Sequence, residues 1–251
     1  MNSILEIVGG GVSCFDFDGD GNCDLFFGCG GQIDPIQQTV VGSGDRLMKG
    51  DGQWGFRDCT NQAHLDTSRL YSHGTSWADW NQDGFNDLLV YGYQGARLWY
   101  NLGDGTFAEL SPELFDYKVW TTAAAWVDLN GDQTLDCYLG SYVDWNFGTH
   151  RVCENKQGIP DVCSPNAFGG MRHAVFLNQG DGSFLHAPEL LVAPEPTKTL
   201  SALTAEFSPG QGVGVYVAND LIANSLFLRR DGHFVEQGLL GGVAGDDKGV
   251  V

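Results

Sequence analysis

Short runs of small and apolar residues flank three acidic segments of this chain. One run precedes each acidic segment and another follows it, at 10–15 and 25–27, 74–78 and 88–91, and 122–127 and 137–139. The runs that follow are apolar without alternation, which is typical of strands covered on both faces. The pattern therefore predicts three pairs of strands, each pair joined by an acidic loop.

A second pair of strands follows each of these pairs. Segments 46–56, 97–107 and 174–184 each carry an Asp-Gly turn between apolar stretches, a strong signal for a β-hairpin. A fourth copy is altered: 215–217 and 225–234 supply strands, but the preceding loop, 206–214, has glycine at its fifth and ninth positions. We expect this fourth loop to turn without binding a metal.

The repetition predicts an all-β fold, and more narrowly a β-propeller of four-stranded antiparallel blades. Solenoid repeats are shorter and seldom hold a complete four-stranded meander. Small residues at 9–11 and 123–125 would let the first strands of neighbouring blades lie close together. We expect a single propeller region over 1–251, with units at about 9–60, 72–112, 120–188 and 199–238 and the start of a further unit at 240–251.

The three acidic loops share one nine-residue spacing. Positions 1, 3, 5 and 9 are Asp or Asn in every copy, and the backbone carbonyl of position 7 adds an oxygen. Calcium takes roughly six to eight oxygen ligands, which such a loop can supply. Glycine at position 6 (Gly21, Gly84) permits the sharp turn, whereas the third loop has Gln133 there. We expect about three Ca²⁺ sites with these ligands: Asp16, Asp18, Asp20, Asn22 and Asp24; Asp79, Asn81, Asp83, Phe85 and Asp87; Asp128, Asn130, Asp132, Thr134 and Asp136.

Plain acidic turns are the alternative interpretation, since turns use Asp, Asn and Gly in any case. That interpretation does not explain why every copy has an acid at position 9. An EF-hand is excluded because it needs a glutamate at position 12 and flanking helices. Position 12 is instead Phe27, Val90 and Leu139.

Composition narrows the classes of partner. The formal net charge of −19 would repel nucleic acid and anionic lipid, and ten of the 32 acids lie in the three loops. No run of 18 apolar residues is present, so we expect no membrane span, and the first residues lack the features of a signal peptide. Calcium sites of modest affinity favour an extracellular, periplasmic or cell-surface location, with a secretion signal upstream of this sequence.

The seven cysteines are an odd count. Cys153 and Cys163 lie in a stretch rich in Gly, Pro and Asn, and a disulfide between them would fit an oxidising compartment. The same pair could instead bind zinc with His150 and His173, although no CxxC spacing is present. Of the others, Cys14, Cys23 and Cys137 are interpreted as small buried residues, whereas Cys29 and Cys59 could be paired or buried.

Two long connections interrupt the repeat, at 29–45 and 142–172. Because strands of a meander alternate in direction, both leave their blades on the face opposite the acidic loops. Long connections in compact domains are usually functional or disordered. We expect an unknown protein or glycan ligand to bind on the face that bears them.

The acidic loops, together with the downstream L-x-x-N-x-G-D-G-x-F hairpins, resemble the FG-GAP/VCBS repeats of integrin α-subunit propellers. The chain is similar in particular to secreted proteins of the cartilage acidic protein (ASPIC/UnbV) type, through the Cys-containing segment 141–168 and the pattern at 217–220 and 224–227. The resemblance implies a calcium-stabilised extracellular propeller, commonly of seven blades, used for adhesion or binding. The four units would then be part of a larger propeller, with a closed four-bladed propeller as the alternative.

The sequence contains no recognisable catalytic constellation. The six histidines show no paired metal spacing, and acids two residues apart in a metal loop make poor proton-transfer groups. We therefore expect a non-catalytic calcium-binding module for adhesion or ligand recognition. The alternative is a carbohydrate-binding protein or a polysaccharide-lyase scaffold, in which exposed aromatics such as Trp145 and Phe147 stack on sugars.

Overall fold

The computed structural model describes residues 2–110, 115, 117–207, 209–210 and 212–245. The chain forms two compact units: Val8–Thr121, here the N-terminal unit, and Thr122–Val251 with Met1–Ile7, here the C-terminal unit. The expected further unit at 240–251 lies partly outside the described residues, as do the last positions of the expected second unit.

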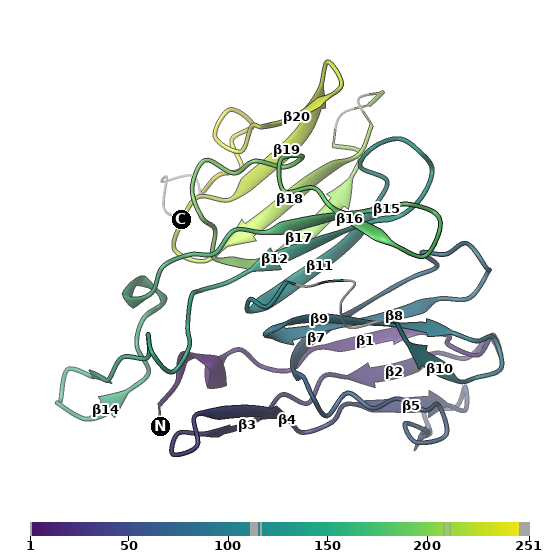
Figure 1. Cartoon of the computed structure of the whole chain (residues 1–251), viewed down its shortest axis with the longest axis horizontal. Helices are drawn as coiled ribbons and strands as arrows, with labels where there is room; N and C mark the ends of the chain where they lie inside the picture. The colour runs from purple at the N-terminus through teal and green to yellow at the C-terminus, as the bar shows by residue number, and fades with distance from the viewer. Residues whose placement is uncertain (1, 111–114, 116, 208, 211, 246–251) are drawn as a thin grey trace. The chain divides into compact units, whose positions relative to one another are not determined.

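The N-terminal unit contains two four-stranded antiparallel meanders (Figure 1). Within each sheet, neighbouring strands pair in the antiparallel direction. The first sheet has the order β1 (Val12–Phe15), β2 (Asp24–Phe27), β5 (Arg46–Gly50) and β6 (Phe56–Asp58). The second has the order β7 (Tyr71–Ala78), β8 (Asp87–Tyr93), β9 (Gly95–Asn101) and β10 (Phe107–Glu109).

The C-terminal unit repeats this arrangement (Figure 1). Its first sheet has the order β11 (Thr121–Val127), β12 (Asp136–Ser141), β15 (Ala174–Asn178) and β16 (Phe184–His186). Its second has the order β17 (Thr199–Ala205), β18 (Gly214–Asn219), β19 (Ser225–Arg230) and β20 (His233–Glu236). Helix is confined, among the described residues, to two short 3₁₀ turns, Ile4–Ile7 and Pro165–Ala167.

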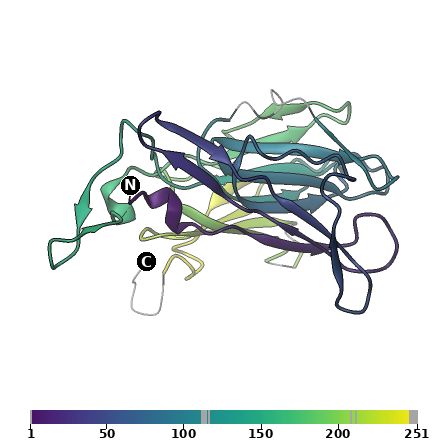
Figure 2. The same cartoon turned by 90° about the horizontal axis from the view of Figure 1, so that it is seen from below.

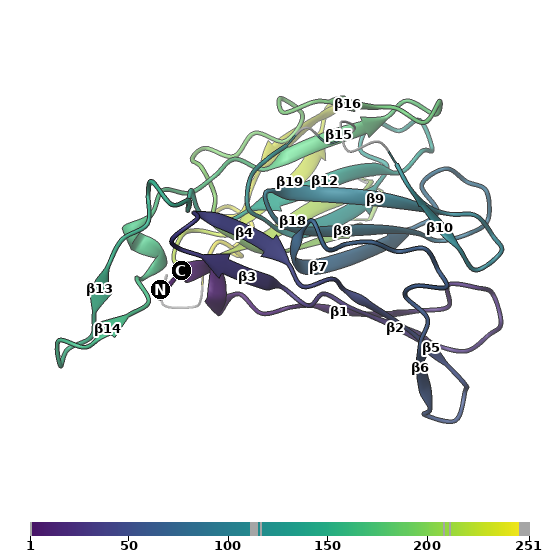
Figure 3. The ribbon, with the colours of Figure 1, turned by 60° about the horizontal axis from the view of Figure 1, so that its bottom comes forward.

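The two long connections each carry a small hairpin. In the N-terminal unit, β3 (Gly31–Asp34) pairs with β4 (Thr39–Gly42) between β2 and β5. In the C-terminal unit, β13 (Cys153–Glu154) pairs with β14 (Pro160–Asp161) between β12 and β15. Figures 2 and 3 show both hairpins as projections from the sheets that carry them.

Each unit has an apolar core between its two sheets. In the N-terminal unit the largest buried side chains include Phe26, Leu88 and Trp99, and in the C-terminal unit they include Tyr138 and Phe227. These residues come from the second and third strands of the meanders, where the sequence has apolar runs without alternation. Burial of such side chains is the main favourable term for packing sheet on sheet.

Small residues let the first strands of the N-terminal unit approach closely. A Cβ added at Gly11 would lie 2.9 Å from the carbonyl oxygen of His73 and 3.0 Å from the Cα of Gly74. Beside it, the hydroxyls of Ser13 and Thr75 lie 2.5 Å apart. This close approach of β1 and β7 is what the glycines at 9–11 predicted for the first strands of adjacent blades.

The described strands confirm the all-β class and the repeated four-stranded antiparallel sheet. Closure of the sheets into a propeller, the number of blades and the extent of a single propeller region over 1–251 stay predictions.

Candidate metal centre

The three acidic loops lie between the first and second strands of their sheets, after β1, β7 and β11. Each has a left-handed backbone at positions 4 and 6. The φ angles at position 4 are 72° for Gly19, 60° for Gln82 and 90° for Gly131, and at position 6 they are 83° for Gly21, 93° for Gly84 and 71° for Gln133. The third loop thus adopts the same turn as the others although glutamine replaces glycine at position 6.

This turn directs backbone N–H groups at the carboxylate of position 1. In the first loop, Gly19 and Gly21 donate to Asp16, each at 2.8 Å. In the second, Asp83 and Gly84 donate to Asp79, each at 3.0 Å, and in the third, Gly131 and Gln133 donate to Asp128 at 2.6 and 2.9 Å. The first aspartate therefore organises each loop without any metal.

The carboxylate of position 5 accepts a hydrogen bond from the backbone N–H of position 7. The donors are Asn22 to Asp20 at 2.9 Å, Phe85 to Asp83 at 2.9 Å and Thr134 to Asp132 at 2.8 Å. In the second and third loops the position-3 amides of Asn81 and Asn130 also donate to the position-5 carboxylates, at 2.9 and 2.7 Å. The metal-ligand role expected of the position-7 carbonyls stays a prediction.

The aspartates at position 9 are buried and connect each loop to the third strand of its sheet. Their exposed fractions are 0% for Asp24, 1% for Asp87 and 0% for Asp136. Each accepts a hydrogen bond from the third strand, donated by the backbone N–H of Gly50 at 2.8 Å, of Asn101 at 2.8 Å and of Asn178 at 2.9 Å. The acid at position 9 therefore has a structural role as well as the expected ligand role.

Burial disfavours the charged form of these acids. It raises the pKa of Asp24 and of Asp136, and with the neighbouring Asp83 and Asp79 charges it raises the pKa of Asp87 to about 7. Backbone hydrogen bonds only partly offset the cost of burial. A cation in the loop would favour the ionised forms of all three.

The residue at position 2 anchors each loop in the core. Phe17, Trp80 and Leu129 are 4%, 5% and 0% exposed. In the N-terminal unit, the side-chain amide of Asn101 donates to the carbonyl of Phe17 at 2.7 Å, although Asn101 belongs to the next sheet. In the C-terminal unit, Arg229 donates to the carbonyl of Leu129 in the same way. A polar residue at the end of the third strand thus holds the acidic loop of the preceding repeat, a contact that sequence reasoning did not find.

The first loop brings three of its predicted ligands together. Carboxylate oxygens of Asp16, Asp18 and Asp24 all lie within 4.8 Å of one another. Oδ1 of Asp18 is buried and accepts no hydrogen bond. A group of hard oxygens with one unpaired, buried carboxylate oxygen fits a calcium ion better than a plain turn, in which such an oxygen would cost free energy.

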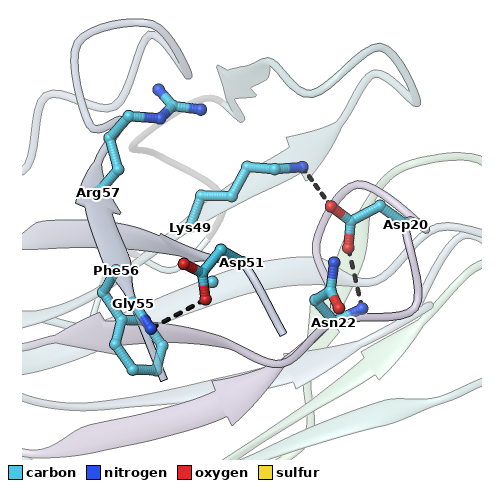
Figure 4. Close-up of a pocket in the computed structure, with 8 residues that line it drawn as sticks. Asp20, Asn22, Lys49, Asp51, Gly55, Phe56 and Arg57 are labelled. Atoms are coloured by element: carbon cyan, nitrogen blue, oxygen red, sulfur yellow. Dashed lines mark hydrogen bonds and ion pairs between the residues drawn. The ribbon is translucent and has the colours of Figure 1, made fainter. Parts of the chain in front are cut away.

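A lysine occupies the other side of this loop. Nζ of Lys49, on β5, lies 2.7 Å from Asp20 Oδ2 (Figure 4). It also contacts Asp18 Oδ2. The two carboxylates raise the pKa of Lys49, and the lysine lowers the pKa of Asp20. Asp18 and Asp20 therefore form ion pairs with Lys49, whereas Asp16 and Asp24 form none with it.

The predicted ligands of the second and third loops lie less close together than those of the first. Among the described residues, no second group of three acidic or histidine and cysteine ligands lies so close together. Asparagine at position 3 of the second and third loops leaves each with three acids instead of four. In the fourth loop, Gly210 donates to Glu206 at 2.6 Å, and glycine stands at positions 5 and 9, while residues 208 and 211 lie outside the described part.

The first loop and the β5–β6 turn line one pocket of about 470 Å³, which includes Asp20, Lys49, Asp51, Phe56 and Arg57 (Figure 4). In this sheet the acidic loop and the Asp-Gly turn therefore share one side, as expected from the meander.

The cysteines correct one prediction. Cys14 and Cys23 are exposed and form a disulfide, with their Cα atoms 6.2 Å apart, so their interpretation as small buried residues is wrong. The loop folds back so that Cys23 at position 8 meets Cys14 on the preceding strand. Cys137 is buried, as expected; Cys59 is buried and Cys29 exposed, and both are unpaired thiols.

The expected disulfide between Cys153 and Cys163 is present. It closes the β13–β14 connection and consumes both sulfurs that a zinc site with His150 and His173 would need. Trp145, considered above as a sugar-stacking residue, is only 3% exposed, and its indole N–H donates to His150 at 3.2 Å. This tryptophan packs inward, so it is not available to a carbohydrate.

Comparison with known proteins identifies part of the repeat. Residues 79–139 match the family model of the FG-GAP-like repeat. The match extends from the second acidic loop to β12. None of the curated proteins compared with the chain matches it significantly.

Among solved structures, a lectin of Agrocybe aegerita described as recognising non-reducing terminal N-acetylglucosamine aligns with 91% of this chain. The alignment covers 65% of the lectin, with 16% identity and a TM-score of 0.33. The chain thus spans less than two thirds of that protein, and a similarity this weak carries no argument about function. Among the described residues, no helix is long and apolar enough to cross a membrane.

Proposed function

We propose that this chain is a calcium-binding β-sheet repeat module for adhesion or ligand recognition outside the cytosol, and that it is not an enzyme. The observation that carries the proposal is the shared geometry of the three acidic loops. Each has the same left-handed positions, the same capped first aspartate and the same buried ninth aspartate. The second and third loops also lie within the segment that matches the FG-GAP-like repeat model.

The proposed ligands are the oxygens predicted from the sequence, with the first loop supported most directly. Asp16, Asp18 and Asp24 would bind the ion there, and bound calcium would neutralise acids that otherwise repel one another. In all three loops, the backbone hydrogen bonds to position 1 hold the carboxylate before an ion arrives. This preorganisation reduces the entropic cost of binding the ion.

Two disulfides support a location in an oxidising compartment, since thiols are kept reduced in the cytosol. We propose an extracellular, periplasmic or cell-surface protein. The narrower resemblance to the ASPIC/UnbV type belongs to this proposal as well, because the family match extends only to the FG-GAP-like repeat.

The proposed recognition surfaces are the two long connections. The β3–β4 hairpin exposes Ile36 and Val41, at 93% and 52%, and the disulfide-closed connection exposes Val152 and Ile159, at 82% and 58%. Exposed apolar side chains on such connections can anchor a protein partner. The carbohydrate alternative has lost the support of Trp145, whereas Phe147 is partly exposed and packs against that tryptophan.

Thermal unfolding with and without calcium tests the proposal. Millimolar calcium should raise the melting temperature relative to chelator, because only the folded chain presents the sites. Asp83→Ala should remove one bound ion and part of this shift, whereas Glu206→Ala in the fourth loop should remove neither. An equal melting temperature in calcium and chelator would contradict the proposal, and binding to a glycan array would revive the carbohydrate alternative.

A further inference from the structure

We propose that Lys49 is a tethered cation that competes with calcium for the first loop, making that loop the weakest of the three calcium sites. This inference rests on the proposed function, since it assumes that the loops bind calcium. The number of acids alone would predict the highest calcium affinity for the first loop, because it has four acids and each of the others has three.

The ammonium group of Lys49 lies against two acids of the first loop. Lys49 Nζ lies 2.7 Å from Asp20, the acid at position 5 of the loop (Figure 4). It also contacts Asp18, the acid at position 3. The lysine side chain is 24% exposed and the two acids are 20% and 32% exposed, so solvent screens the contacts only in part. Both acids are predicted calcium ligands, and each oxygen held by the lysine must be released or shared before an ion can use it.

The second and third loops have no lysine in the corresponding place. Lys49 precedes Gly50, whose N–H donates to the ninth aspartate of the first loop. The residues in the same place before Asn101 and Asn178 are Tyr100 and Leu177. Neither carries a charge, so the second and third loops have no internal cation at this position. Arg229 does contact the third loop, but through the carbonyl of Leu129, which is not one of the expected ligands. Competition from this strand position is therefore specific to the first loop.

The charge balance gives the lysine a second effect. In the absence of metal, the four acids of the first loop would repel one another, and Lys49 offsets part of that repulsion. The lysine should therefore stabilise the metal-free chain while weakening calcium binding. A purely structural surface ion pair would do the first without the second.

Calcium titration by calorimetry, on the full chain at constant ionic strength, tests the inference. The variant Asp18→Ala identifies the binding event of the first loop, because it removes a ligand of that loop alone. Lys49→Met should tighten this event about tenfold. Arg57→Met is the matched control, because Arg57 lines the same pocket and, among the described residues, forms no ion pair with the loop acids. This variant removes a positive charge and should change the affinity less than twofold.

Thermal unfolding supplies an independent readout. In chelator, Lys49→Met should melt at a lower temperature than the parent chain, and the shift produced by calcium should be larger in the variant. The reciprocal variant Tyr100→Lys places an ammonium group beside the second loop and should weaken that site about tenfold. This variant keeps the inference testable if Lys49→Met does not fold.

The outcomes separate the two proposals. If the parent chain binds no calcium, the proposed function fails. The inference is overturned and the function stands if calcium binds but the affinity of the first loop is unchanged in Lys49→Met. The same holds if the affinity of the second loop is unchanged in Tyr100→Lys. Weaker binding in Lys49→Met would also overturn it, since it would make the lysine a support for the bound ion.

Discussion

At the scale of single residues, the loops depend on backbone conformation more than on the count of acids. Positions 4 and 6 are left-handed in all three loops, yet Gln82 and Gln133 occupy two of these six places. A side chain in this conformation costs about 1 kcal/mol or more relative to glycine. The sequence correctly identified glycine at position 6 as a turn residue, but the tolerance of the third loop for Gln133 could not be read from the pattern.

Replacing Gln133 with glycine should relieve this cost. We expect Gln133→Gly to raise the free energy of unfolding by about 1 kcal/mol, measured by urea denaturation in chelator. Gly21→Gln is the reciprocal control, because a Cβ there meets no atom within 4 Å and only the backbone conformation is tested. A loss of stability in Gln133→Gly would indicate that the glutamine side chain contributes more than its backbone costs.

At the scale of elements, local signals predicted the repeat well. The Asp-Gly turns and the apolar runs found β5–β6, β9–β10 and β15–β16 because both signals act within a few residues. Contacts between elements were missed for the same reason. The pairing of Cys14 with Cys23 needs the fold of the loop, and the approach of Lys49 to Asp18 needs the register of β5 beside β2.

The contact between neighbouring sheets can be tested at Asn101, which is 2% exposed. Its side chain donates to Phe17 at 2.7 Å and accepts from the N–H of Gly103 at 3.0 Å. Asn101→Ala should lower the free energy of unfolding by about 2 kcal/mol, since it leaves buried partners unsatisfied.

Urea denaturation measures this loss, with Asn61→Ala as the control because the Asn61 side chain is exposed. Equal stability of the two variants would mean that the acidic loop is held by Phe17 packing alone.

At the scale of the whole molecule, the sequence predicted the class of fold and the place of the proposed sites, but not their relative strength. Four repeated sheets follow from patterns within the chain, and the two compact units follow from packing that no local pattern records. The proposed ranking of the sites depends on Lys49, whose neighbours in sequence give no sign of its contact with the loop. A count of acids alone would rank the first loop highest.

The most direct test is the number of calcium ions bound per chain, measured by equilibrium dialysis against increasing free calcium and metal analysis of the protein. The account predicts that two ions bind first and that the number rises to three at higher calcium, with Glu206→Ala unchanged throughout. A protein that retains no calcium at millimolar concentration would contradict it.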